Sequence, residues 1–305
     1  MSEIYTHMPY RSLGTTGESI SIIGLGGHHI GVQADEKESI AIIRTAIDNG
    51  VNFMDNCWDY HDGTSEIRMG KALQDGYRQK AFLMTKIDGR DATSAQQQID
   101  ECLTRLQTDV IDLLQIHEVI RADDPERIFA AGGAMEALQK SRHAGKFRHL
   151  GFTGHKSPDI HLKMLDAAAD SGIRFDAVQL PLNLFDAHYD SFEKRVMPRL
   201  IDEGIGILGM KPIGGQVLLD SFTVSAEECL RYAMSLPVSV VITGCDSLEI
   251  LEQALEAARN FTPLTSGERA ALLARTAVVA SSGEYELYKT TSAFDATSRH
   301  PEWLG

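Results

Sequence analysis

Four residues whose side chains can transfer or orient a proton follow apolar stretches of the sequence: Asp55, Tyr60, Lys86 and His117. A lysine ammonium beside a tyrosine favours the phenolate, so we expect Lys86 to lower the pKa of Tyr60 from about 10. Such a tyrosine can give and take a proton near neutral pH. Asp55 would hold Lys86 by an ion pair, and His117 would donate to the same substrate oxygen. These four candidate catalytic residues suit a carbonyl group that accepts hydride at its carbon.

Eight short apolar runs alternate with longer amphipathic stretches, which is typical of parallel strands joined by crossover helices. We predict the strands at residues 21–26, 51–55, 81–86, 110–117, 147–153, 175–180, 204–211 and 238–243. The strand ends recur at nearly even intervals, which favours a closed (β/α)8 TIM barrel of the α/β class. An open doubly wound sheet is the alternative, but no G-x-G-x-x-G motif opens a helix after a strand.

The stretches between the strands carry helix signals. We predict helices at 35–49, 92–107, 157–171 and 246–259, the second capped by Thr93 or Ser94 and the last beginning at Asp246. Residues 9–20 predict a short N-terminal hairpin that closes the barrel floor. Residues 265–280 predict a further helix in a C-terminal helical extension.

The last 25 residues, 281–305, are polar but contain four aromatic residues: Tyr285, Tyr288, Phe294 and Trp303. We therefore expect this tail to pack on the body of a single domain, residues 1–305, and to form a lid. Active sites in this architecture lie at the carboxyl ends of the strands, where polar residues recur here, so we expect those residues to meet at one mouth.

The composition excludes several classes of partner. The net charge of −14 disfavours binding to nucleic acid. No stretch of 18 apolar residues predicts a membrane span, and the N-terminus has no apolar signal core, so we expect a cytoplasmic protein. The cysteines form no C-x-x-C pair. Four histidines raise the possibility of a metal, but their spacing fits no compact site, and we predict none: His28, His29, His117 and His155.

Ordered segments of the chain resemble the aldo-keto reductase family over nearly its whole length. They are YRSLGTTGESISIIGLGG, GVNFMDNCWDYHDGTSEIRMGKAL, TKI at 85–87 and DLLQIH at 112–117. The resemblance implies a nicotinamide cofactor, NADP(H) or NAD(H), and a small carbonyl or alcohol substrate. It also places Asp55, Tyr60, Lys86 and His117 on the family's catalytic tetrad. A histidine at the fourth position implies reduction of a carbonyl group and not of a carbon–carbon double bond.

The resemblance also assigns residues that would bind the cofactor. Thr153 replaces a serine, Gly154 stands where an asparagine is expected, and His155 could substitute for that asparagine. Gln179 matches the family's glutamine. Met210 takes the place of the ring that stacks on nicotinamide, and a thioether can pack on a flat ring. The segment that follows would lie near the pyrophosphate: Lys211, Pro212 and Gly214.

The last strand is followed by a segment that resembles the family's adenosine-phosphate block. Gly244, Cys245 and the amides that open the next helix can bind phosphate through backbone N–H groups. Asp246 and Glu249 disfavour a 2′-phosphate, so use of NAD(H) competes with the family's usual NADP(H).

The substrate pocket is assigned to residues that neighbour the predicted strand ends: His28, His29, Trp58 and Phe129, with Ile128 beside it. Two other functions remain open. Lys86 could act as the nucleophile of a Schiff-base lyase. The chain could also be a regulatory subunit that binds the cofactor with little turnover.

Overall fold

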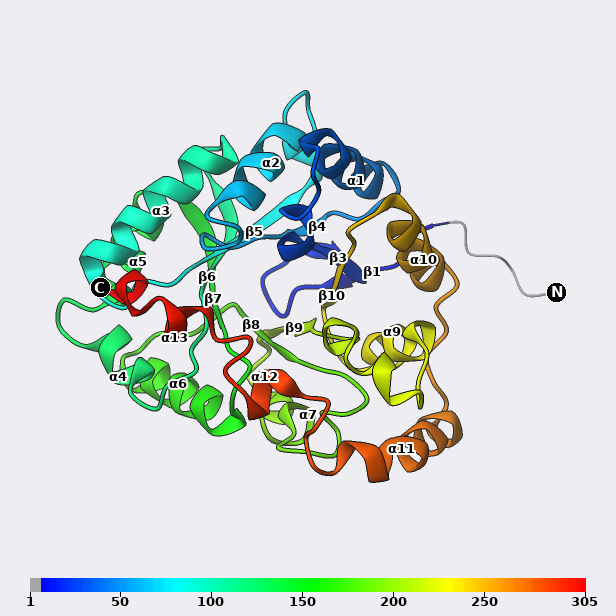
Figure 1. Ribbon diagram of the computed structural model, residues 1–305. Helices are drawn as coiled ribbons and strands as arrows, with labels where there is room; N and C mark the ends of the chain where they lie inside the picture. The colour runs from blue at the N-terminus through cyan, green and yellow to red at the C-terminus, as the bar shows by residue number, and fades with distance from the viewer. Residues whose placement is uncertain (1–6) are drawn as a thin grey trace.

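A closed barrel of eight parallel strands forms the centre of the computed structural model, which describes residues 7–305 (Figure 1). The strands follow one another around the barrel in chain order, and β10 closes the ring by pairing with β3. The structure confirms the predicted (β/α)8 barrel and excludes the open sheet. The strands are β3 (Ile23–Gly26), β4 (Phe53–Asp55), β5 (Phe82–Ile87), β6 (Ile111–Ile116), β7 (Phe147–Thr153), β8 (Ala177–Pro181), β9 (Gly206–Met210) and β10 (Val240–Gly244).

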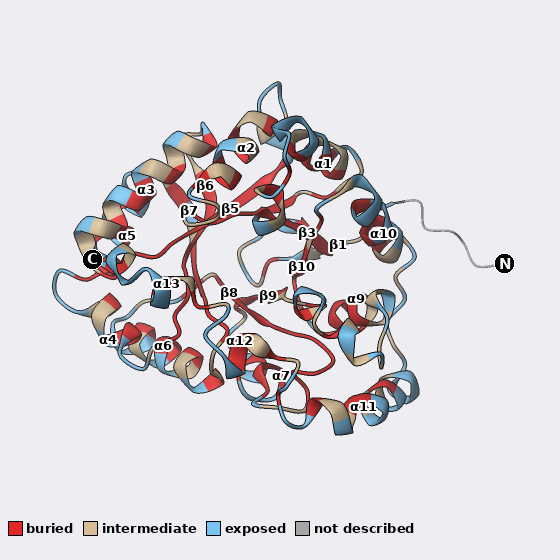
Figure 2. Cartoon of the chain, in the orientation of Figure 1, coloured by how far each residue is buried: buried red, intermediate tan, exposed pale blue. Residues whose placement is uncertain are grey.

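The strands are apolar because both of their faces are covered. Side chains that point inward form a small core within the barrel, which includes Phe53, Met84 and Leu208. Side chains that point outward join a larger core beneath the surrounding helices. Figure 2 shows the strands buried and the outer helix faces exposed. Burial on both faces therefore accounts for the continuous apolar runs of the sequence.

Helices surround the barrel and connect its strands. They are α1 (Glu36–Asp48), α2 (Thr64–Ala72), α3 (Ala92–Leu106), α4 (Asp124–Phe129), α5 (Ala134–His143), α6 (Pro158–Asp170), α7 (Phe192–Arg195), α8 (Met197–Asp202), α9 (Ala226–Ser235) and α10 (Leu248–Arg259). The predicted helices at 35–49, 92–107, 157–171 and 246–259 correspond to α1, α3, α6 and α10. Short 3-10 turns supplement them at Gly27–Ile30, Arg78–Lys80, Gly214–Gln216, Leu219–Ser221 and Pro301–Leu304.

Two helix starts differ from the prediction. Asp91 caps α3, because its side chain accepts hydrogen bonds from the amides of Thr93 and Ser94. The sequence predicts Thr93 or Ser94 itself as the cap. Ser247 caps α10, so Asp246 lies before the helix. In both cases a neighbouring polar residue has the extended backbone that a cap requires.

The N-terminal hairpin closes one end of the barrel. It consists of β1 (Tyr10–Ser12) and β2 (Ser19–Ser21), which pair antiparallel. Leu13 and Ile20 are fully buried and join the core inside the barrel. Gly14 has a φ of 51°, and a Cβ there would lie 2.5 Å from the amide of Gly206 at the start of β9. The close approach of hairpin and barrel thus requires glycine.

The C-terminal extension consists of α11 (Ser266–Ala280), α12 (Leu287–Thr290) and α13 (Ala296–Arg299). Figure 1 shows α12 and α13, in red, on the side of the molecule that faces the viewer. Tyr288 is fully buried, and the Phe294 ring packs near it. The extension therefore packs on the body of the protein. Across residues 7–305, none of the helices is both long and apolar enough to cross a membrane.

Candidate active site

A cavity of about 1090 Å³ lies at the carboxyl ends of the barrel strands. Every barrel strand contributes a lining residue at or near its end: Gly26, Asp55, Lys86, His117, Thr153, Gln179, Met210 and Gly244. The other predicted site residues that line this cavity are Tyr60, His28, His29, Gly154, His155, Lys211, Pro212 and Asp246. The barrel thus gathers, around one space, residues that are far apart in the sequence.

Lys86 is the centre of a buried polar chain at the bottom of this cavity. Its ammonium forms an ion pair with Asp55 and donates a hydrogen bond to the Asn56 carbonyl oxygen, 2.7 Å away. The Tyr60 hydroxyl oxygen lies 3.3 Å from the Lys86 Nζ. Burial lowers the pKa of Lys86, but Asp55 together with the neighbouring Cys57 and Asp59 outweighs it, and the net shift is upward. Lys86 is therefore held as an ammonium beside the phenol.

The pKa of Tyr60 differs from the sequence-based expectation. Burial raises it well above the ordinary value, and the charge of Asp55 raises it further. The Lys86 ammonium, which is paired with Asp55, does not bring the pKa of Tyr60 below its ordinary value. The Tyr60 phenol consequently carries its proton at neutral pH, as a proton donor must.

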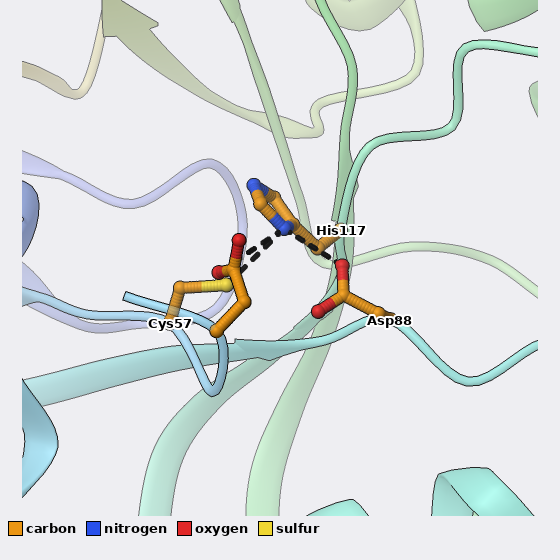
Figure 3. Close-up of side chains that lie close together, drawn as sticks. Cys57, Asp88 and His117 are labelled. Atoms are coloured by element: carbon orange, nitrogen blue, oxygen red, sulfur yellow. Dashed lines mark hydrogen bonds and ion pairs between the residues drawn. The ribbon is translucent and has the colours of Figure 1, made fainter. Parts of the chain in front are cut away.

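His117 contacts a cluster of residues that sequence reasoning missed. Its Nδ1 atom lies 2.9 Å from Asp88 Oδ1, 3.2 Å from Cys57 Sγ and 3.6 Å from Asp59 Oδ1. Figure 3 shows the other ring nitrogen pointing away from Cys57 and Asp88. Burial lowers the pKa of His117, but Asp59 and then Asp88 outweigh it, and the net shift is upward.

Arg90 fixes the two loops that carry this cluster. Its guanidinium donates to the carbonyl oxygens of Asp88, His117 and Glu118 at 2.7 to 2.9 Å. It also forms an ion pair of 2.9 Å with Asp124, and both side chains are fully buried. The backbone after β5 and after β6 is therefore held at a fixed separation.

The residues predicted to grip the nicotinamide lie together on β7, β8 and β9. Gln179 Oε1 is buried and has no hydrogen-bond partner among residues 7–305. An amide N–H of a ligand would satisfy this oxygen, which is the contact expected of a carboxamide. Thr153 Oγ1 lies 3.9 Å from the Met210 sulfur. These residues fit a nicotinamide group.

Gly154 has a structural reason for lacking the expected asparagine. A Cβ at this position would collide with the Val119 carbonyl oxygen and lie 2.9 Å from a His161 ring carbon. His155 does not simply replace the missing side chain, because its Nε2 is 2.9 Å from Asp295 in the C-terminal tail. The tail is thereby connected to the cavity wall.

Lys211 is half-buried at the end of β9, and its ammonium lies 4.6 Å from the centre of the Phe294 ring. Gly214 and Cys245 are buried next to lining residues but do not themselves line the cavity.

Beyond Gly244 the cavity runs between α9 and α10. Charged lining residues at this end are Glu227, Arg231, Asp246 and Glu256. The Arg231 guanidinium is already paired with Glu268 at 2.9 Å.

The residues predicted for the substrate pocket divide into two groups. His28 and His29 line the cavity, and the His28 ring lies 5.3 Å from that of Tyr60. Burial lowers the pKa of His28 to about 4, so this ring is neutral.

Trp58 and Phe129 lie away from the cavity lining. The Trp58 indole donates to Glu101 and packs against Trp303. Phe129 ends α4 and packs on the outer core, together with Ile128. Aromatic residues of the tail line the cavity instead, namely Phe294 and Trp303. The presence of four aromatic residues in the polar tail was the feature of the sequence that indicated a tail packed against the site.

Comparisons with known proteins agree with this geometry. The sequence profile of the Aldo/keto reductase family matches residues 22–228. The chain is 32% identical over 216 residues to the aldo-keto reductase YhdN of Bacillus subtilis (strain 168), covering 66% of this chain and 61% of that protein. It is 31% identical over 230 residues to L-galactose dehydrogenase of Arabidopsis thaliana, covering 70% and 68%.

A solved structure shows the same fold. The holo form of aldo-keto reductase AKR11C1 from Bacillus halodurans superimposes with a TM-score of 0.74 at 23% identity, covering 88% of this chain and 96% of that one. Taken with the family match, this identifies the chain as a member of the aldo/keto reductase family, an oxidoreductase that uses NAD(P)H.

Proposed function

We propose that the protein interconverts an aldehyde or ketone and its alcohol, with Tyr60 as the proton donor. The observation that carries this proposal is the chain of Asp55, Lys86 and Tyr60, which lines the same cavity as His117. A carbonyl oxygen in this cavity needs a proton as its carbon becomes tetrahedral. The protonated Tyr60 phenol is the group that supplies it.

Each remaining residue has a part in that proton transfer. NAD(P)H supplies the hydride when it is bound. The Lys86 ammonium stabilises the phenolate that forms when Tyr60 gives up its proton, and Asp55 keeps Lys86 in position. The His117 Nε2–H donates to the substrate oxygen and so favours the developing negative charge. Gln179 would hold the carboxamide through its unpartnered oxygen.

For the cofactor, we propose that NADH is used at least as well as NADPH. Glu227, Asp246 and Glu256 surround the far end of the cavity, while Arg231 is paired with Glu268. Unpaired carboxylates repel a dianionic 2′-phosphate. A Gln253→Lys variant, which places a cation in the same lining, should improve the dissociation constant of NADPH relative to that of NADH.

The Schiff-base alternative is disfavoured by the state of Lys86. A lysine nucleophile needs a free amine, which usually requires a lowered pKa. Asp55 instead raises the pKa of Lys86. The regulatory alternative is distinguished by turnover, since a subunit that only binds the cofactor would not consume it with any carbonyl substrate.

Two further features of the protein belong to this proposal. The chain would act as one barrel domain, with the tail 281–305 as a lid, because Phe294 and Trp303 line the cavity. A reducing cytosolic environment suits its four cysteines, which are buried and unbridged.

The decisive experiment is the Tyr60→Phe variant. Loss of a general acid typically costs 10²- to 10⁴-fold, so turnover on aldehydes and ketones should fall by at least about 100-fold. Cofactor affinity, followed by the fluorescence of the cavity residue Trp303, should stay within about twofold because no binding group is removed.

The matched control is Tyr77→Phe, which removes a hydroxyl that bonds only to surface Asp48. It should keep the activity of the unmodified protein. A Tyr60→Phe enzyme with normal turnover would show that another group supplies the proton.

A further inference from the structure

The cluster behind His117 contains three kinds of metal ligand within a small volume. One atom each from Cys57, Asp59, Asp88 and His117 lies within 4.8 Å of all the others. The ligand atoms are a sulfur, two carboxylate oxygens and an imidazole nitrogen. Cysteine, histidine and aspartate in a set of four are ligands that Zn²⁺ accepts in tetrahedral geometry.

Two oxygens in the cluster point to a missing ligand. Asp59 Oδ1 and Asp88 Oδ2 are buried without a hydrogen-bond partner among the residues that the structure describes. The side chains of Asp59 and Asp88 are 6% and 0% exposed. Buried carboxylate oxygens are normally bonded, because an unsatisfied charge in the interior is costly. One imidazole faces two carboxylates here, so a divalent cation would offset much of the negative charge.

We propose that Cys57, Asp59, Asp88 and His117 form a binding site for one Zn²⁺ ion. His117 would bind through Nδ1, the atom that faces Cys57 and Asp88 in Figure 3 and lies 3.6 Å from Asp59 Oδ1. Cys57 would bind as the thiolate and His117 through an unprotonated Nδ1, so metal bonds replace the S–H bond and any N–H bond at Nδ1, and the released protons pass to solvent. Asp59 and His117 line the cavity and provide the entry path for the ion.

The surrounding structure supports a rigid site. Arg90 fixes the backbone of Asp88 and His117, as described above, and the Cys57 amide donates to Asn56 Oδ1 at 2.9 Å. Partners beyond the ligands hold metal sites in shape. An ion on Nδ1 also fixes the ring proton on Nε2, the nitrogen that points away from the cluster. A bound ion would therefore hold His117 in the tautomer that carries its proton on Nε2.

The test uses the full chain, stripped with a chelator and titrated with Zn²⁺ against a coloured competitor. We expect a single tight equivalent. Titration with Co²⁺ should give a thiolate-to-metal charge-transfer band together with the visible bands of a tetrahedral ion. The Cys57→Ala variant should bind Zn²⁺ more than about 100-fold more weakly, since losing even an outer partner costs 10- to 100-fold.

A matched control is Cys229→Ala, which removes a buried cysteine of α9 outside the cluster. It should keep both the affinity and the charge-transfer band. Asp88→Asn preserves the size of the side chain and should weaken Zn²⁺ binding by at least about tenfold, which guards against misfolding of Cys57→Ala. The proposal is overturned if Co²⁺ gives no thiolate band, or if Cys57→Ala or a folded Asp88→Asn binds Zn²⁺ like the unmodified chain. Both readouts are independent of turnover.

Discussion

Lys211 is a residue whose charge can change within the ordinary range of assay pH. Its backbone has a φ of 55°, and its ammonium lies over the Phe294 ring. Burial lowers its pKa to about 8. In the protein without ligand, Lys211 is therefore a cation below pH 8 and becomes neutral above it. A phosphate-bearing cofactor in this cavity would favour the cation.

We predict that NAD(P)H affinity depends on the charge of Lys211. Affinity should be highest below pH 8 and should begin to fall as the pH rises through about 8, because the unliganded lysine loses its proton. Lys211→Met should weaken binding by roughly 10- to 100-fold at pH 7, the range for a hydrogen bond to a charged group. It should also remove the pH dependence. Fluorescence titrations between pH 6 and 9 measure both effects.

Lys163→Met, on the exposed face of α6, serves as the control and should change neither quantity. An unchanged pH dependence in Lys211→Met would show that another group governs binding.

The sequence could predict residues whose position follows from the end of a strand. Asp55, Lys86 and Gln179 line the cavity as predicted, because the parallel strands of a barrel end on one side. Trp58 and Phe129 do not line it, because the direction of a side chain in a loop or short helix depends on tertiary packing. The partners of His117 were missed for the same reason, although Asp59 and Asp88 lie close to tetrad residues in the sequence.

Among the elements, the loop after β6 and the C-terminal tail are joined by one carboxylate. The Glu118 side chain accepts hydrogen bonds from the amides of Ala296 and Thr297 and from the Thr297 hydroxyl, at 2.7 to 2.9 Å. It thereby caps the start of α13. Burial raises the pKa of Glu118, but His117 and other partners outweigh it and the pKa is lowered. The tail is thus held by an ionised group.

We predict that Glu118→Ala loosens the tail without unfolding the barrel. The part-buried amide of Ala296 and the buried amide of Thr297 would lose their acceptor, at a cost of about 1–3 kcal/mol. Amide hydrogen exchange in residues 291–305 should become faster, while exchange in the barrel strands should stay the same. Glu126→Ala, on the exposed side of α4, is the matched control. Equal protection of the tail in both variants would exclude this role for Glu118.

Element boundaries show how far local signals reach. The helices predicted at 35–49, 92–107, 157–171 and 246–259 formed because their apolar spacing matched a buried face, and α6 begins at the Ser157–Pro158 pair as expected. The starts of α3 and α10 were displaced to Asp91 and Ser247, since several adjacent residues could serve as caps. Only the path of the incoming chain selects among them.

For the molecule as a whole, Glu286 links stability to pH. Its carboxylate accepts from the Tyr288 hydroxyl and the Lys289 ammonium, each at 2.7 Å, and the residue is fully buried. Burial raises the pKa of Glu286 to about 7 from an ordinary 4.5. The folded protein therefore keeps a proton that the unfolded chain releases between those values. Because the folded state binds more protons than the unfolded state in this range, Glu286 lowers the free energy of unfolding as the pH rises from 4.5 to 7.

We predict that Glu286→Gln flattens this part of the stability profile. The difference in the free energy of unfolding between the variant and the unmodified protein should change by up to about 3 kcal/mol between pH 4.5 and 7, in favour of the variant at higher pH. Urea denaturation at several pH values measures it. Glu284→Gln, at an exposed neighbouring position, should show no such change. Parallel profiles for Glu286→Gln and the unmodified protein would contradict the assignment.

The hairpin floor has a kinetic consequence. Leu13 and Ile20 fill the end of the barrel opposite the cavity, so a ligand that reaches Gln179 has to enter and leave by the same mouth as the carbonyl substrate. The cofactor and the substrate therefore use the same opening and cannot pass through it together. The molecule that binds deeper must bind first and dissociate last, and steady-state inhibition by the alcohol and by oxidised cofactor should reveal that compulsory order.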